Sequence, residues 1–452
     1  MKKTLSLILA GLLLLLGITG CTQQTQLNPD NPVTLTMWHV YGSQTESPLN
    51  DSIHEFNCTV GKDKGIVINV VSVSSSSAID EALTAAAEKE PGAPQLPDLF
   101  TAYPRVAEIV GTDNLLNWND YFTGQELDAF VDEFLEEGYF GDALLMLPVA
   151  KSTELLFLNK TLFSKFGTAN GVTAESLSTY EGLFSACKKF YDWSNGQDMF
   201  QINDFYHYSL SGMAAYSEEF VTDGKLNLES DAFEKVWTPM AHAGIYGGLC
   251  LGDGYASDRW KTGEIVCSTG STAGVLYLRD YVTYSDNTTE NIETAILAYP
   301  RFEKGSAAVV HRGGGLFALK NEDACKNEAA AIFAKWLTQK ENNLNFVTKA
   351  GYLPVTNDAF NSLFADADSV ENEKYRLLYN AVNDMSEKYT YCEVPVYDGV
   401  SDTQSSFEKN VKTVLSAAHL EYWNRIADGE NADTVLDELV SSTLAKIRSL
   451  YQ

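Results

Sequence analysis

The sequence has few basic residues, and this shortage excludes two classes of partner. Its 452 residues include 32 Lys and Arg against 61 Asp and Glu, so the formal net charge is -29 at pH 7. Nucleic acids and anionic lipid surfaces are bound through basic faces, which this composition does not supply. Apolar residues form 45% of the chain, which is enough for sizeable cores and argues against disorder. We therefore expect an acidic, folded protein that binds no nucleic acid.

Short catalytic and metal-binding motifs are also missing. The chain contains no G-x-S-x-G, no H-E-x-x-H and no C-x-x-C, and its seven cysteines are widely spaced. The oxygen-rich segments 286–290 and 428–433 lack the full spacing of a calcium loop, so we interpret both as solvated turns. An exported glycoside hydrolase stays an alternative, because it needs only two carboxylates placed in space. The sequence predicts no enzyme, no cofactor and no metal site.

The N-terminal apolar run, residues 7–16, is too short to span a bilayer. Two lysines precede it, and Ile-Thr-Gly-Cys21 follows closely after it. This order is typical of a signal peptide, and the polar residues that follow are typical of a flexible tether. We expect residues 1–20 to be the signal and 21–31 the tether. The residues before Cys21 resemble the lipobox of bacterial lipoproteins, which implies cleavage before Cys21 and a lipid anchor such as palmitate on its thiol.

Strand and helix patterns alternate at the start of the folded body. Residues 33–40, 66–73 and 97–102 predict strands, and residues 48–57 and 78–88 predict helices. The alternation predicts an α/β sheet with crossover connections. Ligands of such sheets lie beyond the carboxyl ends of the strands. The aromatic and imidazole side chains at those ends are Trp38, His39, Tyr41 and Tyr103.

Several further motifs, taken in order along the chain, resemble one protein family. They are LTMWHVYG from residue 35, LFLNKTLFSKFG from 156, TGEIVCSTGS from 262, AYPRFEKG from 298, HRGGGLFALK from 311 and GYLPV from 351. Over about residues 33 to 450 the chain is similar to the family 1 extracellular solute-binding proteins, which carry sugars, oligosaccharides or glycerol phosphates.

This resemblance implies a two-lobed α/β fold of the type II periplasmic-binding-protein kind, with hinge-crossing strands and a ligand cleft between the lobes. One lobe would comprise residues 32–150 and 303–348, and the other residues 151–302 and 349–452. The implied protein is a lipid-anchored monomer on the extracytoplasmic face of the bacterial cell membrane. It would capture a solute by hinge closure and deliver it to the permease subunits of an ABC importer.

The chain offers the groups that a neutral polyol needs, which are hydrogen-bonding side chains, backbone amides and aromatic faces. The amides of the consecutive glycines 313–315 are part of this set, whereas Lys151 and Glu154 are expected either to pair with each other or to touch the ligand. His39 is either a ligand contact or a structural histidine. The candidate ligand-binding residues are Trp38, Tyr41, Tyr103, Ser152, Thr153, Tyr208, Ser268, Ser271, Gly313 and Tyr352.

Among its relatives, the chain most resembles the sn-glycerol-3-phosphate and glycerophosphodiester binders, with two departures. Pro104 stands where those proteins carry a Glu, and Ser401 and Asp402 stand where they carry an Arg. Arg is the natural bidentate partner of a phosphate. We therefore expect a sugar or polyol as ligand, with glycerol phosphate as the alternative if another cation replaces that Arg. The candidates for this replacement are Arg312, Arg105 and Lys151.

Overall fold

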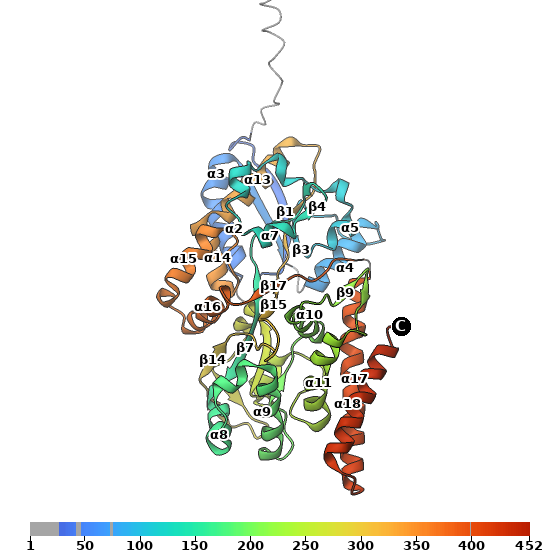
Figure 1. Ribbon diagram of the computed structural model, residues 1–452. Coiled ribbons are helices and arrows are strands. Elements are labelled where there is room, and N and C mark those ends of the chain that lie inside the picture. Colours follow the sequence, from blue (N-terminus) through green and yellow to red (C-terminus); the bar gives the residue numbers. More distant parts are fainter. Residues whose placement is uncertain (1–26, 42–46, 73–75, 398) are drawn as a thin grey trace, which may run out of the picture.

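The computed structural model describes residues 27–41, 47–72, 76–397 and 399–452. Cys21 lies outside these residues. The described chain is built around two main sheets, which occupy the upper and lower halves of the molecule in Figure 1. The first sheet consists of β1 (Val33–His39), β2 (Ile66–Ser72), β3 (Leu99–Ala102), β6 (Leu147–Pro148) and β16 (Gly315–Ala318). The strand order is β2-β1-β3-β16-β6, in which β1 is parallel to β2 and β3, and β16 is antiparallel to both of its neighbours.

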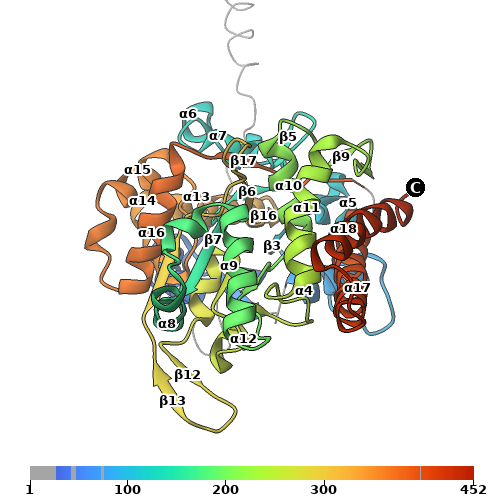
Figure 2. The same cartoon turned by 60° about the horizontal axis from the view of Figure 1, so that its bottom comes forward.

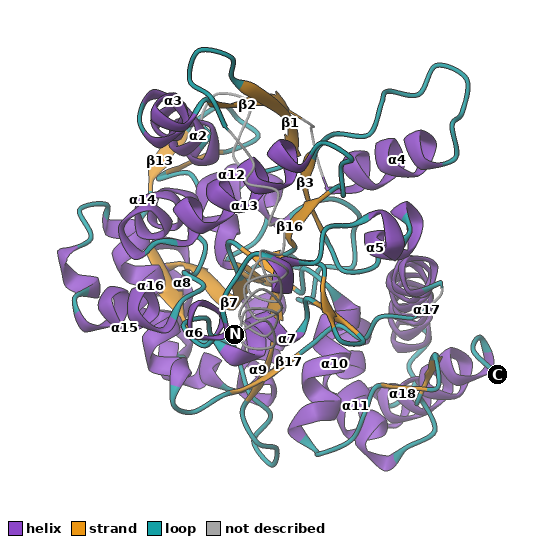
Figure 3. Ribbon diagram, turned by 90° about the horizontal axis from the view of Figure 1, so that it is seen from above, coloured by secondary structure: helices purple, strands orange, loops and turns teal. Residues whose placement is uncertain are grey.

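Helices cover both faces of the first sheet, as the view from above shows (Figure 3). Successive residues of a strand point to opposite faces, so Leu99 packs into a core with α2 and α13, and Phe100 packs into another with α4 and α5. The helices of this half are α2 (Pro48–Cys58), α3 (Val60–Lys64), α4 (Ser76–Ala87), α5 (Val106–Val110), α6 (Gly124–Leu127), α7 (Asp132–Glu136), α13 (Ala324–Thr338) and α14 (Lys340–Ala350).

The elements predicted for the start of the chain are confirmed to within a few residues. Helix α2 shows why the local sequence is sufficient there. The Ser47 hydroxyl accepts a hydrogen bond from the Asn50 backbone amide, and Pro48 occupies the first turn, where its missing N–H removes no helical bond. The spacing of Leu49, Ile53 and Phe56 places all three on the buried face.

The second sheet is organised around β7 (Ser152–Asn159), whose eight residues are all buried. β7 runs antiparallel to β11 (Cys267–Ser271) on one side and to β14 (Thr294–Leu297) and β15 (Ala308–Arg312) on the other. β8 (Phe200–Gln201) and β17 (Thr390–Cys392) complete the sheet next to β11 and β15. The sequence places residues 303–348 in the first lobe, but β15 lies in the second sheet, because His311 and Arg312 pair with Thr153 and Ser152.

The largest hydrophobic core surrounds the second sheet and its helices. Figure 1 shows α17 and α18 as a long helical pair along the side of this half, packed on α11, and Figure 2 shows the hairpin of β12 (Tyr281–Thr283) and β13 (Thr289–Asn291) standing out from it. The main helices are α8 (Lys160–Asn170), α9 (Tyr180–Trp193), α10 (Phe205–Ala215), α11 (Asp231–Tyr246), α12 (Ala256–Thr262), α15 (Asn357–Ala365), α16 (Glu373–Ser386), α17 (Val400–Ala427) and α18 (Ala432–Ser449). Within the described residues, no helix has the length and apolar character needed to cross a membrane.

Three chain segments pass side by side between the two sheets. The first joins β6 to β7, the second joins β15 to β16, and the third follows α14. The backbones of Lys151 and Leu353 exchange hydrogen bonds of 3.1 and 2.6 Å. A Cβ on Gly313, whose φ is +118°, would lie 2.9 Å from the Ala150 carbonyl oxygen, so this crossing requires glycine. The crossings hold the ends of both sheets close together.

Candidate functional site

Two adjoining cavities lie where the ends of the two sheets meet, with volumes of about 560 and 90 Å³. We call the larger the outer compartment and the smaller the inner compartment. Tyr103, Arg312 and Gly313 line both, so the two compartments form one continuous site. The inner compartment begins at the carboxyl ends of β1 and β3, where the α/β pattern predicts a ligand.

The inner compartment brings together six of the ten candidate residues from the sequence. Tyr41 and Tyr352 meet edge to face with ring centroids 5.0 Å apart, and Phe346 supports Tyr41 from behind at 5.3 Å. Aromatic edges and faces of this kind pack against the C–H patches of a sugar, and hydroxyls nearby bind its oxygens. The six candidates are Tyr41, Tyr103, Ser152, Ser271, Gly313 and Tyr352, and Gly314 lies beside them.

The other four candidates do not line either compartment. Trp38 and Ser268 are buried, the former in the core on the α4 side of the first sheet. Thr153 follows Ser152 on the opposite face of β7 and donates its hydroxyl to the Val310 carbonyl at 3.1 Å. Tyr208 lies on α10, which is buried on every side, and donates to the Val236 carbonyl at 2.8 Å. Packing of whole elements, which no local pattern reveals, decides these positions.

His39 is also a core residue. Its Nε2 lies 2.8 Å from the Asn50 side-chain oxygen, and the residue is 3% exposed. Burial lowers the pKa of His39, and the hydrogen bond with Asn50 only partly offsets this effect. The ring is therefore neutral at physiological pH and holds β1 against α2.

Arg312 is the cation that faces both compartments. Its Nη1 donates to Glu154 Oε1 at 3.2 Å, and the same oxygen lies 3.1 Å from His207 Nδ1. Glu154 therefore pairs with these two residues, and Lys151 instead binds Glu137, so the alternative of a pair between Lys151 and Glu154 is wrong. Burial acts to lower the pKa of Arg312, but the surrounding tyrosines and carboxylates outweigh it and raise the pKa. Arg312 thus stays charged.

The outer compartment is acidic on balance. Four carboxylates and two guanidinium groups line it, and Arg105 is already bound to Asp80. Burial acts to raise the pKa of Asp204, but the charges of His207 and Arg312 outweigh it and lower the pKa. Behind Asp204, burial and the charge of Asp204 raise the pKa of Glu408 to about 8. The four lining carboxylates are Glu136, Glu137, Asp204 and Glu393.

Sequence reasoning missed most residues of the outer compartment. Asp204, His207 and Glu393 belong to no recognised motif; Asp204 and His207 lie at the start of α10, and Glu393 follows β17. Pro104 lines this compartment, whereas Ser401 and Asp402 do not, and Gln404 is the α17 residue that does. The signals in the sequence were the ligand-binding candidates Tyr103 and Gly313, and the possible substitute cations Arg105 and Arg312.

Comparison with known families gives the class of this protein. Residues 52–376 match the sequence model of a family described as bacterial extracellular solute-binding protein. This match covers well over half of the chain, and the chain belongs to this family.

Individual relatives carry more specific names. The sn-glycerol-3-phosphate-binding periplasmic protein UgpB of Pectobacterium atrosepticum is 25% identical over 236 residues, which cover 49% of this chain and 52% of that protein. UgpB of Salmonella typhimurium is 24% identical over the same length. The chain thus spans about half the length of the relatives that it matches.

Solved structures match nearly the whole chain. The cyclic alpha-maltosyl-1,6-maltose binding protein from Arthrobacter globiformis has a TM-score of 0.67 at 17% identity, covering 93% of this chain and 100% of that one. UgpB from Mycobacterium tuberculosis in complex with glycerophosphocholine has a TM-score of 0.67 at 15% identity, covering 93% and 99%. At such identities the likeness shows the fold alone, and it confirms the predicted two-lobed α/β class.

Proposed function

We propose that this chain is the capture subunit of an ABC importer, and that it binds a sugar, oligosaccharide or other polyol between its lobes. The observation that carries this proposal is the inner compartment, where tyrosine rings, serine hydroxyls and a glycine backbone converge from both sheets. A ligand that touches both sheets stabilises the closed arrangement of the lobes. A membrane permease would then recognise the closed form. In this proposal the chain binds its solute without converting it.

Charge favours a neutral ligand over a phosphate ester. A phosphate monoester in the outer compartment would meet more carboxylates than guanidinium groups, and Arg312 already donates one N–H to Glu154. The remaining N–H groups of Arg312 suit the vicinal hydroxyls of a sugar, which need no neutralising charge. Glycerol phosphate or a glycerophosphodiester is the second candidate, supported by the names of the relatives and by the presence of Arg312 in both compartments.

The division into lobes is part of the proposal. The lobes would comprise residues 32–150 and 303–348, and residues 151–302 and 349–452, with β15 as the segment whose pairing belongs to the second sheet. The hinge would be the three crossings near Lys151, Gly313 and Leu353. We also propose that Cys21 carries a lipid anchor, and that the protein works as a monomer on the extracytoplasmic face of the membrane.

A thermal-shift panel tests the ligand class. The purified chain is heated with monosaccharides, maltooligosaccharides, polyols, sn-glycerol 3-phosphate and glycerophosphocholine. A ligand at a hundredfold excess over its Kd stabilises the folded protein by about 2.7 kcal/mol. We expect stabilisation by at least one neutral sugar and none by the phosphate esters. The reverse pattern would establish the second candidate, and release of cleaved sugar would contradict a capture role.

A further inference from the structure

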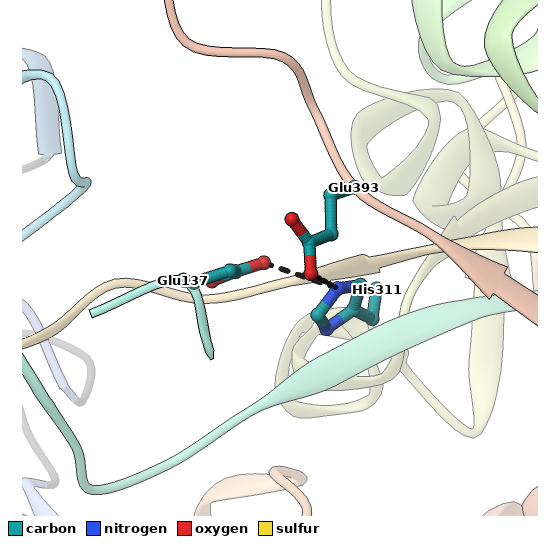
Figure 4. Close-up of side chains that lie close together, drawn as sticks. All are labelled: Glu137, His311 and Glu393. Carbon is teal, nitrogen blue, oxygen red and sulfur yellow. Dashed lines mark ion pairs between the residues drawn. The ribbon is translucent and has the colours of Figure 1, made fainter. Parts of the chain in front are cut away.

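Glu137, His311 and Glu393 form a cluster in the wall of the outer compartment, although they come from three distant parts of the chain (Figure 4). Glu137 follows α7, His311 lies on β15, and Glu393 directly follows β17. His311 Nε2 is 3.1 Å from Glu137 Oε1 and 3.6 Å from Glu393 Oε1. All three ligand atoms lie within 4.8 Å of one another.

These separations fit the ligand shell of a small divalent ion. Zinc bonds to imidazole nitrogen and carboxylate oxygen are about 2.0–2.1 Å long, so two tetrahedral ligand atoms are about 3.3 Å apart. The observed separations of 3.1 and 3.6 Å lie on either side of that value. The longer one exceeds the reach of an ordinary hydrogen bond between nitrogen and oxygen. Both separations from His311 Nε2 are therefore compatible with one ion shared by the imidazole and the two carboxylates.

His311 is held in place and directed toward the two carboxylates. Its side chain is 1% exposed, and the ring of Phe134 stacks on it with centroids 5.6 Å apart. Its Nδ1 is buried without a hydrogen-bond partner among the described residues, so Nε2 is the ring nitrogen that interacts with the carboxylates. Figure 4 shows this nitrogen facing both carboxylates. The buried imidazole and the two carboxylates thus offer three ligand atoms to a single metal ion.

Lys151 supplies the support that a ligating carboxylate requires. Its ammonium binds Glu137 through the oxygen Oε2, which leaves Oε1 toward His311, and it also donates to the Gly313 carbonyl at 3.1 Å. Hydrogen bonds of this kind orient metal ligands and are part of most metal sites. The two carboxylates together neutralise the charge of a divalent ion, and Glu136 adds a further carboxylate to the same compartment.

We propose that Glu137, His311 and Glu393 bind one Zn²⁺ ion, with a fourth position open toward the outer compartment. One imidazole and two carboxylates suit zinc better than the harder ions calcium and magnesium, which prefer oxygen ligands alone. Glu393 has a side chain 46% exposed, so an ion reaches the site from solvent. Gly138, which follows Glu137, accepts hydrogen bonds from the backbone amides of Leu145 and Met146 beside the first sheet. β15 and β17, in contrast, belong to the second sheet. The ion would join the two halves of the molecule.

Zinc titration of the full chain carrying Cys21→Ser tests the proposal, since this change removes a thiol outside the site. We expect one equivalent to bind, and at least tenfold weaker binding in His311→Ala and in Glu393→Gln. Glu393 is half exposed, so Glu393→Gln keeps the test valid if His311→Ala fails to fold. The proposal would be overturned if the parent bound no zinc, or if both variants bound zinc as tightly as the parent does.

The matched control is His54→Ala. His54 Nε2 lies 3.6 Å from Cys58 Sγ on the exposed face of α2, and this pair is the surface alternative for a zinc ion. We expect His54→Ala to bind zinc as the parent does, and bound Co²⁺ to show no thiolate-to-metal charge-transfer band. Loss of binding in His54→Ala, or a thiolate band, would assign the ion to α2 and overturn the proposal. Sugar stabilisation is measured without zinc, so the two proposals fail separately.

Discussion

Tyr352 and Trp38 are both aromatic residues near the ends of secondary-structure elements, α14 and β1, but their surroundings differ. Tyr352 lines the inner compartment, and Trp38 packs in the core with Phe100. If the proposed sugar is the ligand, we expect Tyr352→Ala to weaken its affinity about tenfold, or about 1.4 kcal/mol, because an aromatic contact is lost. Trp38→Ala should instead lower the free energy of unfolding by about 3–5 kcal/mol.

Calorimetric titration with the most stabilising sugar, together with urea unfolding, measures both effects. A larger loss of affinity in folded Trp38→Ala than in Tyr352→Ala would show that the ligand lies on the other side of the first sheet.

Glu408 makes the free energy of unfolding depend on pH, and the burial of its carboxyl group determines the direction of this dependence. Its pKa is raised from 4.5 to about 8, so between these values the folded protein holds a proton that the unfolded chain has released. The free energy of unfolding therefore falls as pH rises through this window, and the contribution stays lost above it. Glu408→Gln mimics the protonated acid, since its amide donates to Asp204 while its oxygen accepts from the Tyr206 N–H.

We expect the free energy of unfolding of Glu408→Gln to equal that of the parent near pH 4.5. Above pH 8 it should exceed the parent value by an amount on the order of a few kcal/mol. Urea unfolding across this range measures the difference. Glu421→Gln, an exposed change on the same helix, should leave the pH dependence of the parent unaltered. If the parent and Glu408→Gln lose stability in parallel as pH rises, Glu408 is not the group responsible.

At the scale of the elements, the contact of β3 with Gly314, the residue just before β16, tolerates no side chain. A Cβ on Gly314 would lie 2.2 Å from the Ala102 carbonyl oxygen, which is backbone and has little freedom to move. We expect Gly314→Ala to lower the free energy of unfolding by about 1–3 kcal/mol, the usual range for overpacking. A Cβ on Gly124 meets nothing within 4 Å, so Gly124→Ala is the control and should leave the denaturation midpoint nearly unchanged. Equal stability of both variants would show that β16 shifts freely.

The same contact bears on the site. Gly313 and Gly314 line the inner compartment, and the glycine run was expected to let backbone approach a ligand. In the structure it lets backbone approach backbone at the crossing between the sheets. A ligand would therefore meet a wall that strand packing has already positioned.

For the whole molecule, the proposed anchor predicts where the protein is found. Cys21→Ser removes the thiol that the lipobox resemblance assigns to lipid attachment, and we expect the variant to leave the membrane fraction for the soluble exported fraction. Its sugar affinity should stay at the parent value, because the residues that line the two compartments lie between Val40 and Gln404. Fractionation with labelled palmitate measures both attachment and location. Membrane retention and labelling of Cys21→Ser would contradict the anchor.

Local pattern in the sequence determined the class of the fold. Alternating apolar residues predicted β1, four-and-three spacing predicted α2, and a run of motifs in order predicted the family. These features depend on neighbours along the chain, where steric preference and periodic burial act directly. The loop at Tyr41 and the glycine at Gly313 were found in the same way, because strand ends and glycine runs are visible in the sequence.

Only the tertiary structure decided which polar and aromatic residues share a space. Thr153 and Ser152 are adjacent in sequence but lie on opposite faces of β7, while Glu137, His311 and Glu393 are far apart in sequence and meet in one wall. Burial energy depends on area removed from water and charge pairing depends on distance in space, and neither quantity follows from position along the chain.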